Sequence, residues 1–365
     1  MDTARKVLVT GGCGFIGANF VRHLHRTCPR WRVVNLDTLT YAGNLDNLQG
    51  IEEGNRYRFV KGDICNTALV EEIFVAEQID TVVHFAAESH VDRSITGPAE
   101  FIQTNIIGTF TLLEAARRNW QDQHRGGTHP LFLHVSTDEV YGSLGETGYF
   151  RETTAYDPRS PYSASKASSD HLVNGYFHTY DLPVMITNCS NNYGPYQFPE
   201  KLIPLIIHNC LQGRALPVYG DGKNIRDWLH VQDHCEAIAA VLEKGAIGAS
   251  YNIGGNNEKE NLEVVERICD IVDDRVGPLS SGEKRRSLIT FVTDRLGHDR
   301  RYAIDAGKIK EQVGWQPKIT FDEGIRKTVD WYLEHQQWVN TIIDGSYRGY
   351  YEKMYGNREI LPPQR

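Results

Sequence analysis

The 365-residue sequence lacks several features that would place it in a specialised class of protein. It has no apolar run near the roughly 20 residues that a membrane-spanning helix requires. After Lys6 come three apolar residues and then a glycine cluster, instead of the longer apolar core of a signal peptide. Internal repeats and low-complexity segments are also absent. We therefore expect a globular protein without a membrane partner.

Cysteine is scarce and follows no recognisable spacing. The seven cysteines form an odd, scattered set that contains no C-x-x-C pair. Neither a disulfide framework nor a zinc site is indicated, since both require patterned cysteines. We therefore expect no bound metal and a cytoplasmic location, where thiols stay reduced.

Positive charge is in deficit, with Lys+Arg 39 against Asp+Glu 47 and a formal net charge of −8. A nucleic-acid-binding protein normally carries a basic surface, so this balance argues against a nucleic-acid partner. It also means that an anionic ligand must be held by local donors, because the overall field of the protein repels it.

The sequence does contain enough apolar material for a large core. Hydrophobic residues make up 40% and charged residues 24%, as in an ordinary globular protein. The first 190 residues alternate short β-branched runs with amphipathic stretches, which predicts a Rossmann-like α/β fold with a doubly wound parallel sheet. The predicted strands span residues 6–10, 32–37, 57–61, 81–86, 131–136 and 183–188, and the predicted helices span residues 15–25, 69–77, 99–119 and 162–180.

The pattern loosens after about residue 190, where glycine and proline become frequent. A helix over 231–244 and a strand over 249–254 are predicted to return to the first sheet. At roughly 150 residues per domain the length predicts about two domains. We expect a Rossmann domain of residues 1–190 plus 228–256. Residues 191–227 plus 257–365 form the expected second domain, a smaller mixed α/β unit.

A glycine-rich turn follows the first predicted strand. Gly11, Gly14 and Gly17 are spaced three apart, which permits a tight turn, close approach of a pyrophosphate and close packing of helix on strand. Alone, such a cluster is equally typical of a simple turn. Asp37, at the end of the second predicted strand, favours dinucleotide binding, because a carboxylate there accepts from a ribose 2′-hydroxyl and repels a 2′-phosphate.

The residues after Asp37 favour NAD over NADP. Thr38 and Leu39 follow it, and no arginine is present there to bind a 2′-phosphate. Asp63 and Ile64, after the third predicted strand, are placed to face the adenine, although an aspartate at such a position is also typical of a turn or helix cap.

Tyr162 and Lys166 are four residues apart in a predicted helix and therefore share one face. A tyrosine with a pKa of about 10 is a poor base at neutral pH. A nearby ammonium and a positive nicotinamide stabilise the phenolate and lower that pKa. Alone, the pair is more typical of an exposed helix, but beside a dinucleotide motif it indicates catalysis. Ser136 and Thr137 are placed to donate to the same substrate oxygen.

These motifs together resemble the extended short-chain dehydrogenase/reductase superfamily, and longer blocks resemble its dTDP-glucose 4,6-dehydratase family. The resemblance covers about residues 6–340. The matching blocks are YAGNL at 41–45, AAESHVDRS at 86–94, STDEVYG at 136–142, SPYSASKASSD at 160–170, NCSNNYGP at 188–195, FPEKLIP at 198–204, IRDW at 225–228 and DRLGHDRR at 294–301.

The resemblance implies conversion of dTDP-glucose to dTDP-4-keto-6-deoxyglucose and water, with NAD recycled. The hydrogen at carbon 5 becomes acidic only after carbon 4 is oxidised to a ketone. The implied catalytic residues are Thr137, Asp138, Glu139, Tyr162 and Lys166, with Tyr162 acting at carbon 4, Glu139 as the base at carbon 5 and Asp138 as the acid at carbon 6.

Physical chemistry alone does not assign the two carboxyl groups. Coupling between adjacent carboxyls pushes their pKa values apart, so the pair supplies one acid and one base in either order. Both reach one sugar only if the chain leaves strand geometry near Asp138, because successive strand side chains face opposite ways. Without the resemblance, an Asp-Glu pair at a strand end is more typical of a solvated turn.

Further residues match family positions that bind the cofactor or the substrate. The implied cofactor-binding residues are Gly11, Gly14, Phe15, Ile16, Gly17, Asp37, Thr38, Leu39, Thr40, Asp63, Ile64, Phe85, Ala86, Ala87, Glu88, Ser89, Thr104, Tyr162, Lys166 and Asn192. The implied substrate-binding residues are Ser89, Thr137, Asn191, Lys201, Leu202, Pro217, Val218, Tyr219, Arg226, Asn261, Arg295 and His298.

Three of these residues would supply local positive charge for an anionic substrate, although the net charge of the protein is negative. Lys201, Arg226 and Arg295 would form a local anion site, although a surface salt bridge is the usual role of a loop arginine. Leu296 stands where the family has proline, which loosens the block that carries Arg295 and His298.

Alternative functions remain open. A nucleotide-sugar 4-epimerase or decarboxylase of the same superfamily needs no acid–base pair to lose a hydroxyl, so Asp138 and Glu139 argue against it. A non-catalytic NAD-binding regulatory protein would have no use for that pair either. The resemblance also implies a homodimer through a four-helix bundle of the helices at 99–119 and 162–180, and a role in deoxysugar biosynthesis such as the dTDP-rhamnose pathway.

Overall fold

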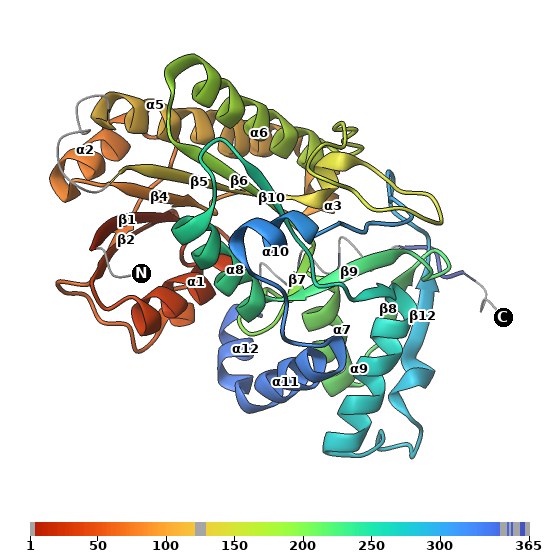
Figure 1. Ribbon diagram of the computed structural model, residues 1–365. Helices are drawn as coiled ribbons and strands as arrows, with labels where there is room; N and C mark the ends of the chain where they lie inside the picture. Colours follow the sequence, from red (N-terminus) through yellow and green to blue (C-terminus); the bar gives the residue numbers. More distant parts are fainter. Residues whose placement is uncertain (1–3, 121–128, 344–348, 350–351, 353–357, 362–365) are drawn as a thin grey trace.

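The computed structural model describes residues 4–120, 129–343, 349, 352 and 358–361, and its larger part is a parallel sheet between two layers of helices (Figure 1). Seven strands pair in the order β10-β6-β5-β4-β1-β2-β3, and every pairing is parallel. The predicted doubly wound α/β fold is thus confirmed. The strands are β1 (Arg5–Thr10), β2 (Trp31–Asp37), β3 (Tyr57–Lys61), β4 (Thr81–His84), β5 (Leu131–Thr137), β6 (Val184–Cys189) and β10 (Ser250–Ile253).

The two faces of the sheet are covered because successive strand residues alternate between them. Val7 and Val9 pack into a core with helices on one face, whereas Leu8 packs into the core on the other. The helices of the first face are α1 (Phe15–Thr27), α8 (Val231–Lys244) and α10 (Gly307–Val313). The helices of the second face are α2 (Thr67–Glu77), α5 (Thr109–Trp120) and α6 (Pro161–Tyr180).

The chain returns to this sheet after leaving it, as the sequence pattern predicts. α8 packs against α1, and β10 then pairs with the outer edge of β6, where Tyr251 lies beside Thr187. The nucleotide-binding unit therefore contains a segment that is distant in sequence.

The helix predicted over residues 99–119 is interrupted. The chain forms α3 (Val91–Thr96) and α4 (Pro98–Phe101), then the π-helical segment η2 (Ile102–Gly108), and only then α5. Within η2 the buried Asn105 accepts from the backbone N–H of Glu88 at 2.9 Å and donates to the Ser165 hydroxyl at 2.8 Å. The wider turn thus aims Asn105 at a loop and at α6, which a regular amphipathic pattern does not reveal.

The remaining elements form a second lobe below the sheet in Figure 1. β7 (Asn191–Tyr193), β9 (Ile225–His230) and β11 (Glu258–Glu260) form one small sheet, and β8 (Leu216–Tyr219) pairs in parallel with β12 (Ile289–Val292). A separate apolar core joins them to the helices. These are α7 (Leu202–Gln212), α9 (Asn261–Val276), α11 (Phe321–Glu334) and α12 (Gln336–Ile342); the short 3₁₀ turns of the chain are η1 (Leu45–Leu48), η3 (Asp138–Tyr141) and η4 (Arg285–Leu288).

Within the described ranges, no helix has both the length and the apolar character needed to cross a membrane.

Candidate active site

A cavity of about 370 Å³ opens where the carboxyl ends of the parallel strands meet. This is the edge at which open α/β sheets bind ligands, beside the point where the strand order reverses between β1 and β4. All the sequence-predicted cofactor residues except Leu39 line it. The predicted residues at the ends of β1, β2, β3 and β4 therefore meet in one place with those of η2, α6 and β7.

The glycine turn brings the backbone to the floor of this cavity. Gly11 has a φ of +70°, and a Cβ there would lie 2.7 Å from backbone atoms of Ala86. A Cβ on Gly17 would collide with the carbonyl oxygen of Gly11. Gly14 caps α1 without a side-chain hydrogen bond, so the first N–H groups of the helix face the cavity edge. Such N–H groups and the positive end of the helix dipole suit a pyrophosphate.

Asp37 shapes the loop around the same cavity. Its two carboxylate oxygens accept from the backbone N–H groups of Cys13 at 2.9 Å and Leu39 at 2.8 Å. Leu39 thus contributes its backbone to Asp37 and its side chain lies away from the lining. Because a carboxylate has about four acceptor sites, Asp37 keeps acceptor capacity for a ribose hydroxyl. The residues present therefore fit NAD.

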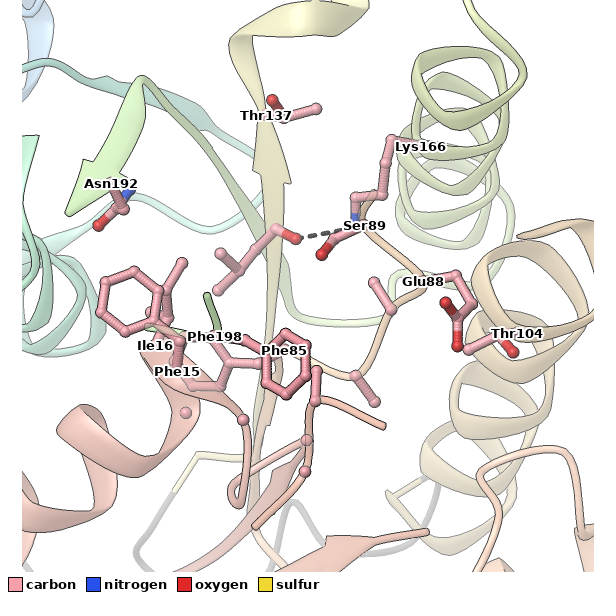
Figure 2. A pocket seen from close by; sticks show the side chains of 18 of the residues that line it. Phe15, Ile16, Phe85, Glu88, Ser89, Thr104, Thr137, Lys166, Asn192 and Phe198 are labelled. Carbon is pink, nitrogen blue, oxygen red and sulfur yellow. Dashed lines mark hydrogen bonds between the residues drawn. The ribbon is translucent and has the colours of Figure 1, made fainter. Parts of the chain in front are cut away.

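Tyr162 and Lys166 lie at the start of α6, which begins with a capping box. The Ser160 hydroxyl accepts from the backbone N–H of Ser163 at 3.0 Å, and Pro161 occupies the first helical position. Lys166 reaches from its helix to β5 and donates from Nζ to the carbonyl of Val135 at 2.9 Å (Figure 2). Both catalytic side chains are buried and line the cavity.

A buried polar group stands behind Lys166. His134 Nε2 lies 3.3 Å from Lys166 Nζ and 3.3 Å from Asp170 Oδ1. The other Asp170 oxygen accepts from the hydroxyls of Ser136 at 2.9 Å and Tyr156 at 2.8 Å. Ser136 and Thr137 both line the cavity, but the Ser136 hydroxyl is engaged by Asp170. Burial lowers the pKa of Lys166 to about 8, and the Asp170 carboxylate opposes that shift.

The pKa of Tyr162 differs from the sequence expectation. Burial and then the negative charge of Glu139 raise the pKa of Tyr162 well above its ordinary value, with only a hydrogen bond from Thr137 acting against them. In the protein alone the phenol is thus held neutral, and its activation requires additional positive charge in the cavity.

The carboxyl pair meets the geometric condition set by the sequence. β5 ends at Thr137, and the 3₁₀ turn η3 begins at Asp138, with the Thr137 hydroxyl accepting from the backbone N–H of Glu139 at 3.3 Å. Because the chain leaves strand geometry at this residue, Asp138 and Glu139 both line the cavity.

The surroundings of these two carboxyls differ in charge. Burial, Glu139 and Asp227 raise the pKa of Asp138 well above its ordinary value. Burial also raises the pKa of Glu139, but the cations of Arg295, Arg226 and Lys201 oppose it. The pKa of both carboxyls is raised, but only Glu139 has several cations that favour its ionised form. This difference is compatible with the acid and base roles that the resemblance implies.

A second cavity, of about 170 Å³, joins the first and extends into the C-terminal lobe. Every predicted substrate residue except Thr137 lines it, and Thr137 lines the first cavity. Glu139, Asn191 and Asn192 line both, so the carboxyl base lies where the two cavities meet.

Several polar atoms in this second cavity suit a ligand. Asn191 Oδ1, Asn261 Oδ1 and Arg295 Nε are buried without a hydrogen-bond partner among the described residues. Arg226 is 4% exposed and donates to the carbonyls of Ile225 and Asp299, at 2.7 and 2.8 Å. Carbonyls leave its charge unneutralised, so Arg226 is not the surface salt bridge that a loop arginine usually forms.

Some lining residues were missed by the sequence reasoning. His90, Asp92 and Glu200 line the second cavity, and all three lie inside blocks that carried the family resemblance. Gln197 and Trp228 also line it. The blocks marked these segments as informative, but only the folded chain shows which of their side chains face inward.

The fold and the paired cavities define a class of protein, the extended short-chain dehydrogenases/reductases, in which a Rossmann unit binds a dinucleotide and a C-terminal lobe binds the substrate. A family model described as GDP-mannose 4,6 dehydratase matches residues 8–328. The chain is 61% identical to the dTDP-glucose 4,6-dehydratase of Xanthomonas campestris pv. campestris strain B100 over 344 residues, which are 93% of this chain and 97% of that protein.

Solved structures agree. A dTDP-glucose 4,6-dehydratase from Bacillus anthracis in complex with NAD is 49% identical with a TM-score of 0.82, covering 93% of this chain and all of that one. A dTDP-glucose 4,6-dehydratase from Streptomyces venezuelae with NAD and TDP bound is 45% identical with a TM-score of 0.84, covering 92% and 99%. The chain belongs to the dTDP-glucose 4,6-dehydratase family.

Proposed function

We propose that this protein converts dTDP-glucose to dTDP-4-keto-6-deoxyglucose and water, as a NAD-dependent hydro-lyase. The observation that carries the proposal is the pair Asp138 and Glu139 at the start of η3. Both line the first cavity, and nearby carboxylates raise the pKa of Asp138 whereas nearby cations oppose the rise for Glu139. An oxidation at carbon 4 alone would need neither group.

The chain supplies the proton transfers. The Tyr162 phenol would first lose its proton, favoured by the positive charge of Lys166 and of a bound nicotinamide. The phenolate then takes the proton of the carbon 4 hydroxyl, with the hydroxyl of Thr137 beside it. Glu139 removes the proton at carbon 5, and Asp138 gives a proton to the hydroxyl that leaves carbon 6. The glycine turn and Asp37 would hold NAD⁺ in the first cavity, where it would supply the hydride acceptor for carbon 4 and the hydride donor for carbon 6.

The second cavity is proposed to hold the nucleoside diphosphate. Lys201, Arg226 and Arg295 supply local positive charge on a protein whose net charge is −8, and the buried polar atoms of Asn191 and Asn261 are free to bond it. The acidic composition is compatible with this anionic substrate because binding depends on these few donors.

One experiment separates the candidate functions. The purified protein is incubated with dTDP-glucose and no added NAD, and the sugar nucleotide is examined by mass spectrometry. Loss of one water supports the dehydratase. A product of unchanged mass would support the 4-epimerase, and an unchanged substrate would support a regulatory protein. A decarboxylase would instead be supported by loss of carbon dioxide when the substrate is a uronic acid.

The preference for thymine over uracil as the nucleotide base of the substrate is tested in the same assay. We expect dTDP-glucose to be converted with a higher kcat/KM than UDP-glucose. A clear preference for UDP-glucose would refute the substrate assignment and leave the dehydration chemistry intact.

We further infer the domain limits, location and assembly of the protein. Pairing of β10 with β6 supports a NAD-binding domain of residues 1–190 plus 228–256, and the separate apolar core supports a sugar-nucleotide domain of 191–227 plus 257–365. Seven free thiols, six of them buried, support the reducing cytoplasm. Exposed Ile102, Ile107 and Phe110 on η2 and α5 support a homodimer built on these helices and α6.

A further inference from the structure

The last described segment of the chain lies beside the second cavity. Residues 358–361 run antiparallel to β12, with the N–H of Leu361 donating to the carbonyl of Phe291 at 2.9 Å and the N–H of Thr293 donating to that of Glu359 at 3.0 Å. β12 pairs with β8, whose residues line the cavity, so this isolated bridge places the segment beside the cavity wall (Figure 1). No motif in the sequence indicates this contact.

Arg358 reaches from this segment to two residues of the cavity wall. Its guanidinium carbon lies 4.3 Å from the centre of the Tyr219 ring, and its Nη2 lies 3.9 Å from Asp92 Oδ1. The Tyr219 hydroxyl donates to the other Asp92 oxygen at 3.4 Å. Arg358 Nη1 also donates to the carbonyl of Thr293 at 3.0 Å. Both Tyr219 and Asp92 line the second cavity, whereas Arg358 contacts them and is not itself a lining residue.

These contacts bear on an anionic ligand in two ways. Asp92 is 6% exposed, and a buried carboxylate in the wall would repel a diphosphate unless a cation offsets its charge. A guanidinium over an aromatic face is attracted to the ring and restricts its motion. The bond to Thr293 also fixes the end of β12, directly before the block that carries Arg295 and His298.

We propose that Arg358 is a positioning residue for the nucleotide: it orients the Tyr219 ring and offsets the charge of Asp92, so that the second cavity binds a nucleoside diphosphate. This inference rests on the proposed function, because it takes the second cavity to be the nucleotide site. The C-terminal segment thereby becomes part of the substrate site, although the Arg358 side chain does not itself line the second cavity.

The test compares Arg358→Ala with a matched control, Arg275→Ala. Arg275 also lies in the C-terminal lobe and pairs with a carboxylate, Asp330, but on the surface between α9 and α11. Binding of dTDP to the NAD-loaded protein is measured by calorimetry. Arg358→Ala is expected to weaken binding about 3- to 30-fold, the range of a partly buried cation–π contact, with retained NAD and Tm unchanged. Arg275→Ala is expected to leave dTDP binding unaltered, and Arg358→Lys to recover part of the loss.

A double mutant identifies the route. If Arg358 acts through Tyr219, then Arg358→Ala costs less affinity in a Tyr219→Leu background than in the natural chain. Equal losses in both backgrounds, dTDP binding within about twofold of normal, or a loss matched by falling NAD content and Tm would each overturn the inference. Failure of the unmodified protein to bind dTDP would instead refute the proposed function, and the inference with it.

Discussion

At the scale of single residues, two adjacent carboxyls acquire different chemistry from their neighbours. Asp138 faces Glu139 and Asp227, which favour its protonated form, whereas Glu139 faces three cations that favour its ionised form. Two carboxyl side chains, one position apart, thus have different charge environments, because most of the neighbouring charges come from distant segments.

Glu139→Gln tests the base assignment. The amide cannot take the proton from carbon 5, so we expect oxidation at carbon 4 to persist, seen as transient NADH absorbance, while product formation falls about 10²-fold or more. Glu146→Gln, an exposed change on a nearby loop, serves as the control and should retain normal turnover. Product formation near the normal rate in Glu139→Gln would show that another group is the base.

The charge of Lys166 predicts the alkaline pH dependence. Because burial lowers the pKa of Lys166 to about 8, the ammonium is present below that pH and is lost as pH rises through it. Burial holds the pKa of Tyr162 well above its ordinary value, so its phenolate depends on nearby positive charge, and the charge of Lys166 is lost in this range. We expect the rate of NADH formation in a single turnover to fall above about pH 8.

Asp170→Asn extends the same prediction. Removing the carboxylate that holds the Lys166 pKa up should move the loss of NADH formation to lower pH. The Lys166 ammonium is also near other titratable groups that remain in the variant, namely His84, His134, Cys189 and Tyr162. A rate lowered equally at every pH would mean that Asp170 acts only by supporting the fold.

At the scale of elements, the turn between β1 and α1 brings backbone to the cofactor cavity only because it lacks side chains. Gly11 approaches Ala86, and Gly17 packs on Gly11. The same close approach explains why this motif can be read from sequence: a short spacing of glycines is a local consequence of a local steric limit.

Gly17→Ala should therefore lose cofactor. Its Cβ collides with the carbonyl oxygen of Gly11 and displaces the turn; a displacement that costs about 1.4 kcal/mol of binding free energy lowers affinity about tenfold. NAD retained after purification is the measurement. At Gly54 a Cβ meets nothing within 4 Å, so Gly54→Ala should keep its NAD. Normal NAD content in Gly17→Ala would contradict this account of the turn.

At the scale of the whole molecule, the active site is a junction between two lobes. Glu139 and Asn192 line both cavities, so the sheet and the C-terminal lobe must meet for the substrate to reach the cofactor. In the proposed homodimer, the apolar side chains that are exposed on η2 and α5 contact a second copy of the chain.

Phe110→Lys tests that assembly. Phe110 is 44% exposed on α5, and a charge there should disfavour a helical interface and reduce the mass measured by light scattering to that of one chain. Val75, 66% exposed on α2, provides the control substitution Val75→Lys, which should leave the mass unchanged. A monomeric natural protein, or a dimeric Phe110→Lys variant, would refute the proposed interface.

The sequence by itself determined what depends on local pattern. Short β-branched runs between amphipathic stretches located the strands of the main sheet, the glycine spacing located the dinucleotide turn, and the Tyr162–Lys166 spacing placed both on one helix face. The helical and strand patterns at 231–244 and 249–254 also predicted the return of α8 and β10 to the sheet. The family blocks then supplied the roles of Asp138 and Glu139.

Tertiary structure decided what depends on segments that meet only after folding. The interruption of the 99–119 helix by η2 follows from Asn105 bonding Glu88 and Ser165. The neutral state of Tyr162 and the direction of Lys166 follow from burial and from β5. Arg358 reaches Tyr219 from the far end of the chain. Charge and contact act across space, so no local pattern encodes them.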